Sequence, residues 1–394
     1  MYRREKSQMN DFGKKGKTHT RRRFKRFIDS PLQFFTNGSI DDLNTLKILL
    51  KKNNLIFKLV HQDTYTYKKL LDVWLMEIVN YTEEWKEKWD SFVLKSNNGT
   101  IFHLQKFLDY HPPGKFSFNH LMFIDKCKIV AVLPGELKDG LFESPIGASY
   151  GSIVTGDIKF SKAMDFVSAL LDYGRKNGIK EFLLTSAPFI YEKYQNQNLD
   201  FAMLWQGFGY ETHYISSAIK LDPHRDILKR FQSTVRYNIR KTFRNENIKV
   251  EINERYDEFY PILLENLRKH NAKPTHSYED LIRLKSLLPD NLKLFMVYYK
   301  DKTIGSSLTF FCNDRVVLCF YNMLLYEYAQ YKPIHRVMYE VVKYSTEQGY
   351  KYVDIGVSQD TSAENPMTPN MNLIEFKETF DAKTVMRNTL YIKL

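Results

Sequence analysis

One segment near the middle of the chain carries the residue types that bind anions. Arg236, Arg240 and Arg244 recur at intervals of four residues, and Lys241 follows the second of them. An apolar stripe with the same helical spacing runs beside them and comprises Val235, Ile239 and Phe243. The pattern predicts a helix that buries the stripe and presents guanidinium groups, whose fork of donors suits phosphate or carboxylate oxygens. The alternative is a solvated cationic face, because runs of charge usually form one.

A second constellation lies toward the C-terminus and contains carboxylates, a lysine and a tyrosine. A segment with a proline at its helix start carries Tyr339 and Glu340, a predicted buried strand contains Asp354, and a later segment places Lys377 beside two phenylalanines. Carboxylates accept protons where burial raises their pKa. Because the two phenylalanines are four residues apart, they would anchor one helix face and turn Lys377 about 100° away from it. The alternative for Tyr339, Glu340 and Asp354 is ordinary helix packing or a place at a strand end.

Other catalytic motifs lack the context that they need. The segment from Gly147 to Gly151 matches G-x-S-x-G, but strand rather than helix follows Ser149, so the segment is not a nucleophile elbow. Its glycines let the backbone run close to a neighbouring strand or to a ligand, and in the second case Tyr150 and Gly151 bind substrate. The ten histidines include no HExxH pair, and the sequence contains no GxxxxGK[ST] or GxGxxG phosphate loop. We therefore assign no metal ion and expect no chemistry driven by ATP.

The elements that position these residues occur twice in the chain. Residues 172–184 align with residues 343–355 at an offset of 171, and in both copies an amphipathic helix ends at a glycine before a buried strand. Upstream, two predicted β-hairpins at 118–133 and 292–311 repeat at an offset that is four residues longer. The repeat predicts a mixed α/β domain that occurs twice.

Charge and composition separate the N-terminal residues from the rest. The chain has 394 residues and a formal net charge of +12, but residues 1–30 alone hold 11 basic and three acidic side chains. We interpret 1–30 as a disordered basic tail, 31–75 as an N-terminal extension with helical spacing, and 76–221 and 222–394 as the two repeated domains. Three cysteines without metal-binding spacing, and the lack of an apolar run long enough for a signal peptide or membrane span, indicate a cytoplasmic protein.

Four short motifs occur in order over the second half of the chain. They are R-x-x-I-R-K at 236–241, a helix start with Pro333, Asp-x-Gly at 354–356 and Phe-Lys-x-x-Phe at 376–380. In these motifs the sequence resembles the FemAB-like branch of the GNAT acyltransferase superfamily, over about residues 76–394. The resemblance implies two tandem GNAT-like domains that share a cleft, in which an acyl or aminoacyl group passes from an activated donor to an amine. Such a reaction needs in-line positioning and donors to the oxyanion rather than a covalent enzyme intermediate.

The resemblance also implies a function and a set of site residues. It implies an N-acyltransferase that acts on a cell-envelope, peptidoglycan or polysaccharide precursor, with acetyl-CoA, another acyl-CoA or aminoacyl-tRNA as donor. The partners that it suggests are a phosphate-bearing glycan or peptidoglycan precursor, tRNA, and the inner face of a membrane. The catalytic residues would be Lys377, Asp354 and Glu340. The substrate-binding residues would be Arg236, Arg240, Lys241, Tyr150, Gly151 and Tyr339.

The sequence departs from acetyl-CoA-dependent GNAT enzymes in the loop that binds pyrophosphate. Those enzymes carry [QR]-x-x-G-x-[GA] before a helix, whereas residues 206–211 fail at the final position and residues 331–336 contain no glycine. The alternative site for the pyrophosphate of coenzyme A is a loop around Gly151 and Gly156. Two other functions remain open: a nucleic-acid-binding protein that uses the basic tail and the helix at 236–244, and a duplicated GNAT scaffold that binds a glycan without catalysis.

Overall fold

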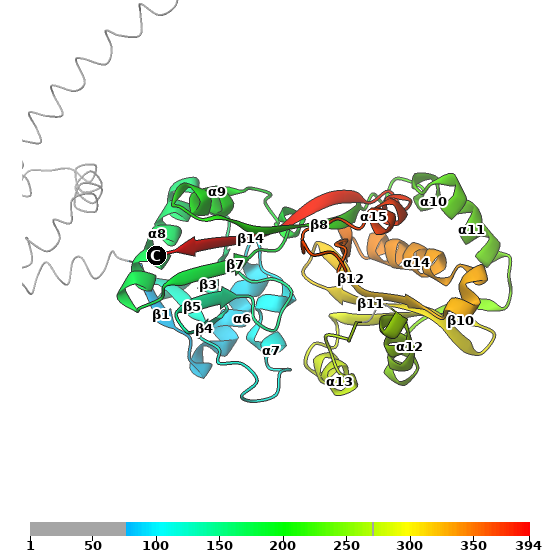
Figure 1. Cartoon of the computed structure of the whole chain (residues 1–394), viewed down its shortest axis with the longest axis horizontal. Coiled ribbons are helices and arrows are strands. Elements are labelled where there is room, and N and C mark those ends of the chain that lie inside the picture. The colour runs from blue at the N-terminus through cyan, green and yellow to red at the C-terminus, as the bar shows by residue number, and fades with distance from the viewer. Residues whose placement is uncertain (1–75, 270–271) are drawn as a thin grey trace, which may run out of the picture. The chain divides into compact units, whose positions relative to one another are not determined.

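The structure is a computed structural model that describes residues 76–269 and 272–394. The predicted basic tail at 1–30 and the extension at 31–75 lie outside the described residues. Residues 76–394 form one compact unit (Figure 1). Within this unit the chain forms two successive halves, which we describe in turn.

The first half packs a long amphipathic helix, α8, against its strands. Its strands are β1 (Glu77–Asn80), β2 (Leu121–Asp125), β3 (Lys128–Leu133), β4 (Glu136–Lys138), β5 (Leu141–Ser144), β6 (Val154–Thr155), β7 (Glu181–Thr185) and β8 (Gly209–Lys220). Its helices are α6 (Lys86–Lys95), α7 (Gln105–Leu108), α8 (Phe160–Lys176) and α9 (Asn198–Trp205), with 3-10 helices at Glu83–Trp85, Ile101–His103 and Phe189–Tyr191. Helix α8 buries Phe166, Val167, Leu170 and Leu171 at helical spacing.

The second half packs helix α14 in the same way. Its strands are β9 (Ile248–Asn253), β10 (Leu292–Tyr299), β11 (Lys302–Phe311), β12 (Val316–Leu324), β13 (Tyr352–Val357) and β14 (Lys383–Lys393). Its helices are α10 (Ile227–Arg230), α11 (Ser233–Phe243), α12 (Tyr256–Lys269), α13 (Tyr278–Leu287), α14 (Pro333–Glu347) and α15 (Met371–Glu378), with a 3-10 helix at Tyr326–Tyr331. Helix α14 buries Val337, Met338, Val341 and Val342. In Figure 1, α11, α14 and α15 lie on one side of this half's strands and α12 and α13 on the other.

The repeat inferred from the sequence is present in the fold. The hairpin of β2 and β3 corresponds to the hairpin of β10 and β11. Helices α8 and α14 end just before Gly178 and Gly349, whose φ angles of 73° and 82° suit glycine at a helix C-terminus. Strands β7 and β13 follow these two glycines. The predicted mixed α/β architecture in two copies is confirmed.

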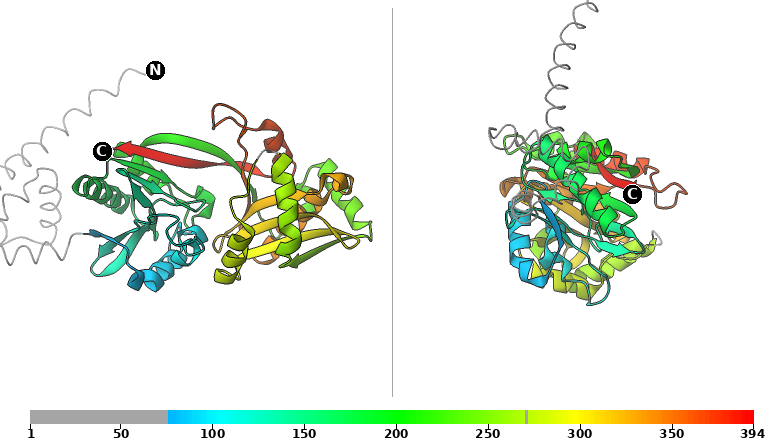
Figure 2. Two further views of the ribbon diagram at one scale, coloured as in Figure 1. Left: turned by 60° about the horizontal axis from the view of Figure 1, so that its bottom comes forward. Right: turned by 90° about the vertical axis from the view of Figure 1, so that its left-hand side faces the viewer.

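The last strand of each half completes the sheet of the other half. The described strands form a four-stranded sheet, β1-β2-β3-β6, and a ten-stranded sheet, β4-β5-β7-β14-β8-β13-β12-β11-β10-β9. Strand β8 of the first half pairs antiparallel with β13, whereas β14 at the end of the chain pairs with both β7 and β8 (Figure 2). The two halves therefore share backbone hydrogen bonds as well as side-chain contacts.

An apolar cluster joins the two halves along this shared sheet. It contains Tyr150 and Tyr191 from the first half together with Leu318 and Val385 from the second. All four side chains are less than one-tenth exposed. Asp354, one of the residues predicted to do chemistry, lies on β13 and bonds to Tyr150 and Tyr191 of this cluster.

Candidate functional site

Strands β12 and β13 run side by side for only three residue pairs and then part. Their parallel pairing covers Val316–Leu318 and Tyr352–Asp354. Beyond Asp354 a bulge interrupts the pairing of β13 with β8, and Gly356 adopts a φ of 76°. Backbone groups in a buried segment need partners, so those that the ladder releases must find them elsewhere. Side chains from α15 and from both halves supply contacts at this point.

Asp354 lies at the point of separation and connects the two halves. Its side chain is fully buried. Oδ1 accepts hydrogen bonds from Ser216 Oγ at 2.7 Å and from Gly356 N at 2.8 Å. Oδ2 accepts from Tyr191 Oη at 2.9 Å and from Tyr150 Oη at 3.4 Å. Because four donors already occupy both oxygens, this geometry favours a positioning role for Asp354 over the expected role as a proton acceptor.

The two tyrosines that donate to Asp354 are held as neutral phenols. Burial raises the pKa of Tyr150 and of Tyr191 well above the ordinary value, and the negative charge of Asp354 raises both further. Their rings contact each other with centroids 5.1 Å apart. Both phenols therefore remain hydrogen-bond donors to the carboxylate at neutral pH.

Lys377 on α15 caps the free end of β13. Nζ donates to the carbonyl oxygens of Gly356 at 2.8 Å and Val357 at 2.9 Å, and to Ser358 Oγ at 2.8 Å. The side chain is only 4% exposed. Burial lowers the pKa of Lys377 to about 8, although the charge of Asp354 opposes this shift. The site thus holds a buried ammonium group that loses its proton only slightly above neutral pH.

The two phenylalanines beside Lys377 differ in burial, although their spacing predicts that both are buried. Phe380 is 1% exposed, whereas Phe376 is 36% exposed, and their ring centroids are 5.3 Å apart. Both rings contact His335 at the start of α14. Lys377 rather than Phe376 is the buried residue of this turn, because three oxygen acceptors replace the water that its ammonium group loses.

The glycine-rich segment before Ile153 packs against a neighbouring strand. Gly151 N donates to Thr185 O at 2.8 Å, and a Cβ atom on Gly151 would lie 2.3 Å from Ser144 Oγ. Close approach of the backbone accounts for the glycine, which supports the strand alternative at this residue. Tyr150, the residue before it, reaches Asp354, so the segment positions one of the predicted residues.

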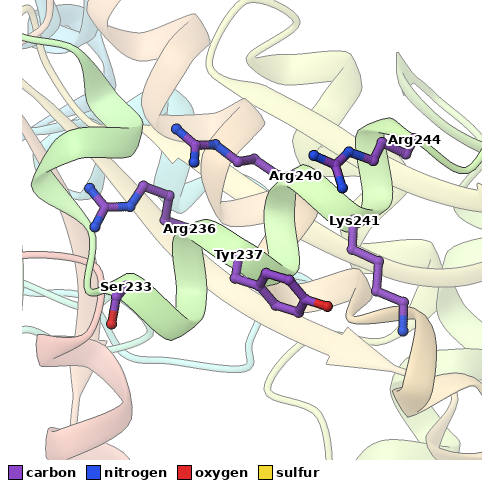
Figure 3. Close-up of a pocket in the computed structure, with 6 residues that line it drawn as sticks. All are labelled: Ser233, Arg236, Tyr237, Arg240, Lys241 and Arg244. Atoms are coloured by element: carbon purple, nitrogen blue, oxygen red, sulfur yellow. The ribbon is translucent and has the colours of Figure 1, made fainter.

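Helix α11 has the two faces that its sequence predicts. Val235, Ile239 and Thr242 are buried. The opposite face borders a pocket of about 230 Å³ (Figure 3). The residues that line it are Ser233, Arg236, Tyr237, Arg240, Lys241 and Arg244. None of its four basic residues forms an ion pair within the part of the chain that the structure describes.

A second pocket, of about 540 Å³, shares Lys241 and Arg244 with the first. Sequence reasoning missed the residues that complete it, which include Asn238, Asn245, Asn247, Gln330, Tyr331 and Lys332. Tyr331 stacks on Tyr299 with ring centroids 4.2 Å apart. Asn238 lies on α11, Asn245 and Asn247 lie in the loop after it, and Gln330 lies in the 3-10 helix before α14. No periodicity identifies these amide side chains. The two pockets form one tract of amide and cationic side chains, which we call the α11 tract.

Tyr339 and Glu340 belong to the packing of α14 on α11. Glu340 Oε1 accepts from Arg336 Nε at 2.8 Å, and Arg336 Cζ lies 4.1 Å from the ring centroid of Phe243. The rings of Tyr339 and Phe243 are 5.2 Å apart. These contacts support the helix-packing alternative for both residues. The structure brings Lys377 and Asp354 to one strand end and places Glu340 with the α11 helix instead.

The start of α14 does not fit the pyrophosphate loop of acetyl-CoA-dependent GNAT enzymes. Lys332 precedes the helix with a φ of 55°, and Pro333 at its first turn has no N–H group to donate. A Cβ atom on Gly305 would lie 2.7 Å from Pro333 Cβ, so the helix start packs directly on β11. Gly156 has open space around its Cβ position, whereas Gly151 is closed by Ser144. Of the two glycines in the loop proposed for pyrophosphate binding, Gly156 has space for a ligand and Gly151 does not.

Among residues 76–269 and 272–394, no group of three or more histidine, cysteine, aspartate or glutamate side chains is placed to hold a metal ion. No helix in the described part of the chain is both long enough and apolar enough to cross a membrane.

Part of the chain matches a known domain family. Residues 229–365 match the family model of the GNAT acetyltransferase domain, which covers α11, the parting of β12 and β13, and Asp354. No curated protein matches the sequence. The fold of FemX is similar, with a TM-score of 0.60 and 13% identity over 81% of this chain and 98% of that chain.

Two other solved structures share the fold at low identity. One is the C-terminal domain of a putative lysylphosphatidylglycerol synthetase from Agrobacterium fabrum, with a TM-score of 0.50 and 11% identity over 78% of this chain and 91% of that chain. The other is L-PGS from Bacillus licheniformis, with a TM-score of 0.52 and 10% identity over 77% of this chain and 90% of that chain.

The match assigns a GNAT acetyltransferase domain to residues 229–365, and such a domain supports an acyl-transferring enzyme. The likeness to FemX, over almost its whole length, shows a shared fold, which agrees with the fold that the motifs predicted. The predicted fold of two GNAT-like halves is confirmed at the same time.

Proposed function

We propose that the protein is an N-acyltransferase that modifies an amine on a phosphate-bearing precursor of the cell envelope, such as a glycan or a peptidoglycan precursor. The observation that carries the proposal is the buried Lys377 ammonium group, which caps the end of β13 where two parallel strands of the matched GNAT domain part. The envelope acceptor is supported by the fold shared with a putative lysylphosphatidylglycerol synthetase, whose name refers to a membrane phospholipid. The α11 tract supplies cations for the phosphate of such an acceptor.

The transfer step needs a field that stabilises negative charge. The amine nitrogen attacks the donor carbonyl carbon, a C–N bond forms, and the bond from that carbon to the donor's sulfur or oxygen breaks. The amine releases the proton that the leaving group takes up. Negative charge develops on the carbonyl oxygen. The three N–H groups of Lys377 already donate to the end of β13, so the ammonium group acts through its charge, which attracts that oxygen more strongly in a buried site than in water.

Each of the other site residues has a supporting task in this proposal. Asp354, with its four donors, holds Tyr150 and Tyr191 of the first half against the end of β13. Arg236, Arg240 and Lys241 bind the anionic part of the substrate through charge-assisted hydrogen bonds. The acyl donor is either an acyl-CoA, as the GNAT domain implies, or an aminoacyl-tRNA. The start of α14 does not favour the acyl-CoA.

A mass-spectrometric assay tests the proposal. The full chain is incubated with acetyl-CoA or with charged tRNA in parallel, and with amino-sugar nucleotides or peptidoglycan precursors as acceptors. We expect the acceptor to gain the mass of one acyl group, and the Lys377→Met variant to lose this product. If no acceptor gains an acyl group with either donor, the proposed transfer is wrong and a scaffold without catalysis is favoured.

Nucleic-acid binding is the second candidate function, and the α11 tract is the observation that favours it. Four basic side chains without acidic partners line one helix face. Binding through phosphates would weaken steeply with salt, with a slope that falls as cations are removed. Fluorescence anisotropy with a single-stranded oligonucleotide, for the wild type and Arg240→Ala, measures that slope. Equal slopes in the two proteins would exclude α11 as the binding surface.

A further inference from the structure

Three exposed aromatic side chains lie together where helix α9 packs on the start of α8. Phe160 is 42% exposed, Phe201 is 55% exposed and Trp205 is 71% exposed. The ring centroids of Phe160 and Phe201 are 5.6 Å apart, and those of Phe201 and Trp205 are 6.3 Å apart with nearly parallel planes. Figure 1 shows α8 and α9 toward the opposite end of the unit from α11. We call these three residues the α9 patch.

Helix α9 is apolar on its outer face as well as on its buried face. Ala202 and Met203 are buried, whereas Phe201 and Trp205, four residues apart, share the outer face. A helix at a protein surface ordinarily carries polar side chains on its outer face. The one charged residue of α9, Asp200, is partly buried, and burial raises its pKa to about 6. A group of exposed rings on such a helix marks an interaction surface.

Two amide side chains beside the α9 patch are already engaged with the backbone. Asn198 Nδ2 donates to the carbonyl oxygen of Ile158 at 2.9 Å, and Gln206 Nε2 donates to that of Met164 at 2.9 Å. A sugar stacked on the rings would need such groups for its hydroxyls, because a polar group that leaves water without a new hydrogen bond is costly. The α9 patch therefore favours an apolar partner.

The area of the α9 patch is small for a protein partner. An aromatic side chain buries about 150–250 Å², so three rings that are about half exposed offer roughly 300–400 Å². A stable protein interface takes about 800 Å² from each partner. A lipid bilayer requires no such area, since a few apolar side chains insert reversibly and aromatic rings favour the boundary between headgroups and acyl chains.

The sequence supplies a second attraction to a membrane. Beside Phe160, the exposed charges of Asp157 and Lys159 are opposite, so the rings are not surrounded by charge of one sign. Residues 1–30, in contrast, hold 11 basic and three acidic side chains. A basic segment is attracted to anionic lipid headgroups, and stable attachment to a membrane takes two signals. The three rings and the basic residues are two signals of different kinds.

We propose that the α9 patch inserts into the surface of a lipid bilayer, with Phe160, Phe201 and Trp205 at the boundary between headgroups and acyl chains. Insertion of this kind needs no membrane-spanning helix. It brings the enzyme to acceptors that are linked to a lipid. The lipid-linked class of acceptor rests on the proposed function, whereas the membrane-binding surface does not.

Sedimentation with vesicles tests the surface without acyl transfer. The full chain is mixed with vesicles of phosphatidylcholine and phosphatidylglycerol at physiological ionic strength, and we expect the wild type to sediment with them. The double variant Phe201→Ser/Trp205→Ser should lower the partition coefficient at least about tenfold, because two apolar side chains no longer leave water. The matched control Leu94→Ser removes a 65% exposed apolar side chain from α6 and should leave it unchanged. Equal binding by the wild type and the double variant, or no binding by the wild type, would overturn the proposal.

Fluorescence measures insertion directly and covers a double variant that does not fold. Lipids with brominated acyl chains quench a tryptophan that enters the bilayer, and we expect them to quench the wild type. Trp205→Phe keeps an apolar ring, so it should bind the vesicles as the wild type does and lose this quenching. The chain has four tryptophans, and this variant assigns the signal to one of them. Unchanged quenching in Trp205→Phe would contradict insertion of the α9 patch.

Two other partners of the α9 patch would give different results. A dimer of the wild type that the double variant loses, measured by light scattering without lipid, would make the patch an interface between two copies and overturn the membrane assignment. A shift of tryptophan emission with a soluble oligomer of N-acetylglucosamine, lost in Trp205→Phe, would make it a sugar-binding surface and overturn it as well. Failure of acyl transfer in the assay above changes none of these measurements, so the two proposals fail separately.

Discussion

The ammonium group of Lys377 is held by neutral oxygen acceptors rather than by a bonded carboxylate. Burial lowers its pKa to about 8, so its charge is lost in a pH range where the acceptor amine becomes more reactive. Only the charged form stabilises negative charge on the carbonyl oxygen, and we therefore expect kcat to fall as the pH rises through about 8. Lys377→Arg keeps its charge at higher pH and should shift the falling limb upward. A pH-rate profile of both proteins checks this, and identical limbs would exclude Lys377 as the titrating group.

Replacing Lys377 by methionine separates catalysis from stability. Methionine keeps most of the aliphatic length and removes the charge, so we expect kcat to fall by ~10²–10³ with little change in KM. The pKa of Lys377 is lowered from 10.5 to about 8 in the folded state, so the unfolded chain binds more protons between these values. The wild type should therefore gain stability relative to Lys377→Met as the pH rises through this range. Steady-state kinetics and thermal unfolding at several pH values measure the two effects, and a wild-type kcat in the variant would remove Lys377 from the transfer step.

Asp354 tests the difference between a buried and a surface carboxylate. In the wild type, Tyr191 and Ser216 donate to the two carboxylate oxygens of Asp354. Asparagine replaces one of these oxygens by an NH₂ group, which cannot accept a hydrogen bond, so buried donors lose their acceptor. We expect Asp354→Asn to lower the free energy of unfolding by about 1–3 kcal/mol or more. The matched control is Asp172→Asn, whose exposed i, i+3 pair with Arg175 is of a type that contributes below about 1 kcal/mol. Chemical denaturation compares the two, and equal losses would show that the four donors on Asp354 add no stability.

Helix α11 separates packing from binding on its two faces. The Arg240 side chain is exposed and lines the pocket on one face of α11. The Ile239 side chain, on the opposite face, is buried. We expect Arg240→Ala to weaken binding of a phosphate-bearing ligand by ~1.5–3 kcal/mol and to change stability by less than about 0.5 kcal/mol. Arg175→Ala on α8 is the matched control, because Arg175 is exposed and lies outside the pocket. Calorimetric titration with the ligand measures affinity, and an equal effect of the two variants would place the anion elsewhere.

Helices and hairpins of this chain follow from local patterns in the sequence. The spacing of Val235 and Ile239 fixes the buried face of α11, and Gly178 and Gly349 mark the ends of α8 and α14. Each of these features depends on residues within one or two turns of one another, so periodicity and glycine conformation are enough to predict them.

Pairing between distant strands has no such local pattern. The exchange of β8 and β14 depends on which sheet edge each strand meets, and alternation of side chains leaves this open. Three of the four donors to Asp354 come from residues 150, 191 and 216, which are far from it in the chain. Lysine is rarely buried, so its residue type predicts an exposed Lys377, and only the carbonyl groups freed at the end of β13 explain its burial.

The shared sheet makes residues 76–394 one folding unit rather than two. Strand β14 supplies hydrogen bonds to β7 in the first half, β8 supplies them to β13 in the second, and an apolar cluster spans both halves. Neither half can unfold without breaking backbone pairs and exposing apolar surface in the other. We therefore expect the 76–394 fragment to unfold in a single cooperative transition, although its sequence repeat suggests two domains.

Calorimetry and a truncation test this coupling. For the 76–394 fragment, the calorimetric enthalpy of unfolding should equal the van't Hoff enthalpy. Ending the chain at Ala382 removes β14, which leaves an edge of β7 and an edge of β8 unpaired. This truncation should abolish cooperative unfolding of the first half, although every residue that it removes lies at the end of the second. Two separate transitions in the intact fragment, or an unchanged first-half transition after truncation, would show that the halves fold independently and that the strand exchange adds little stability.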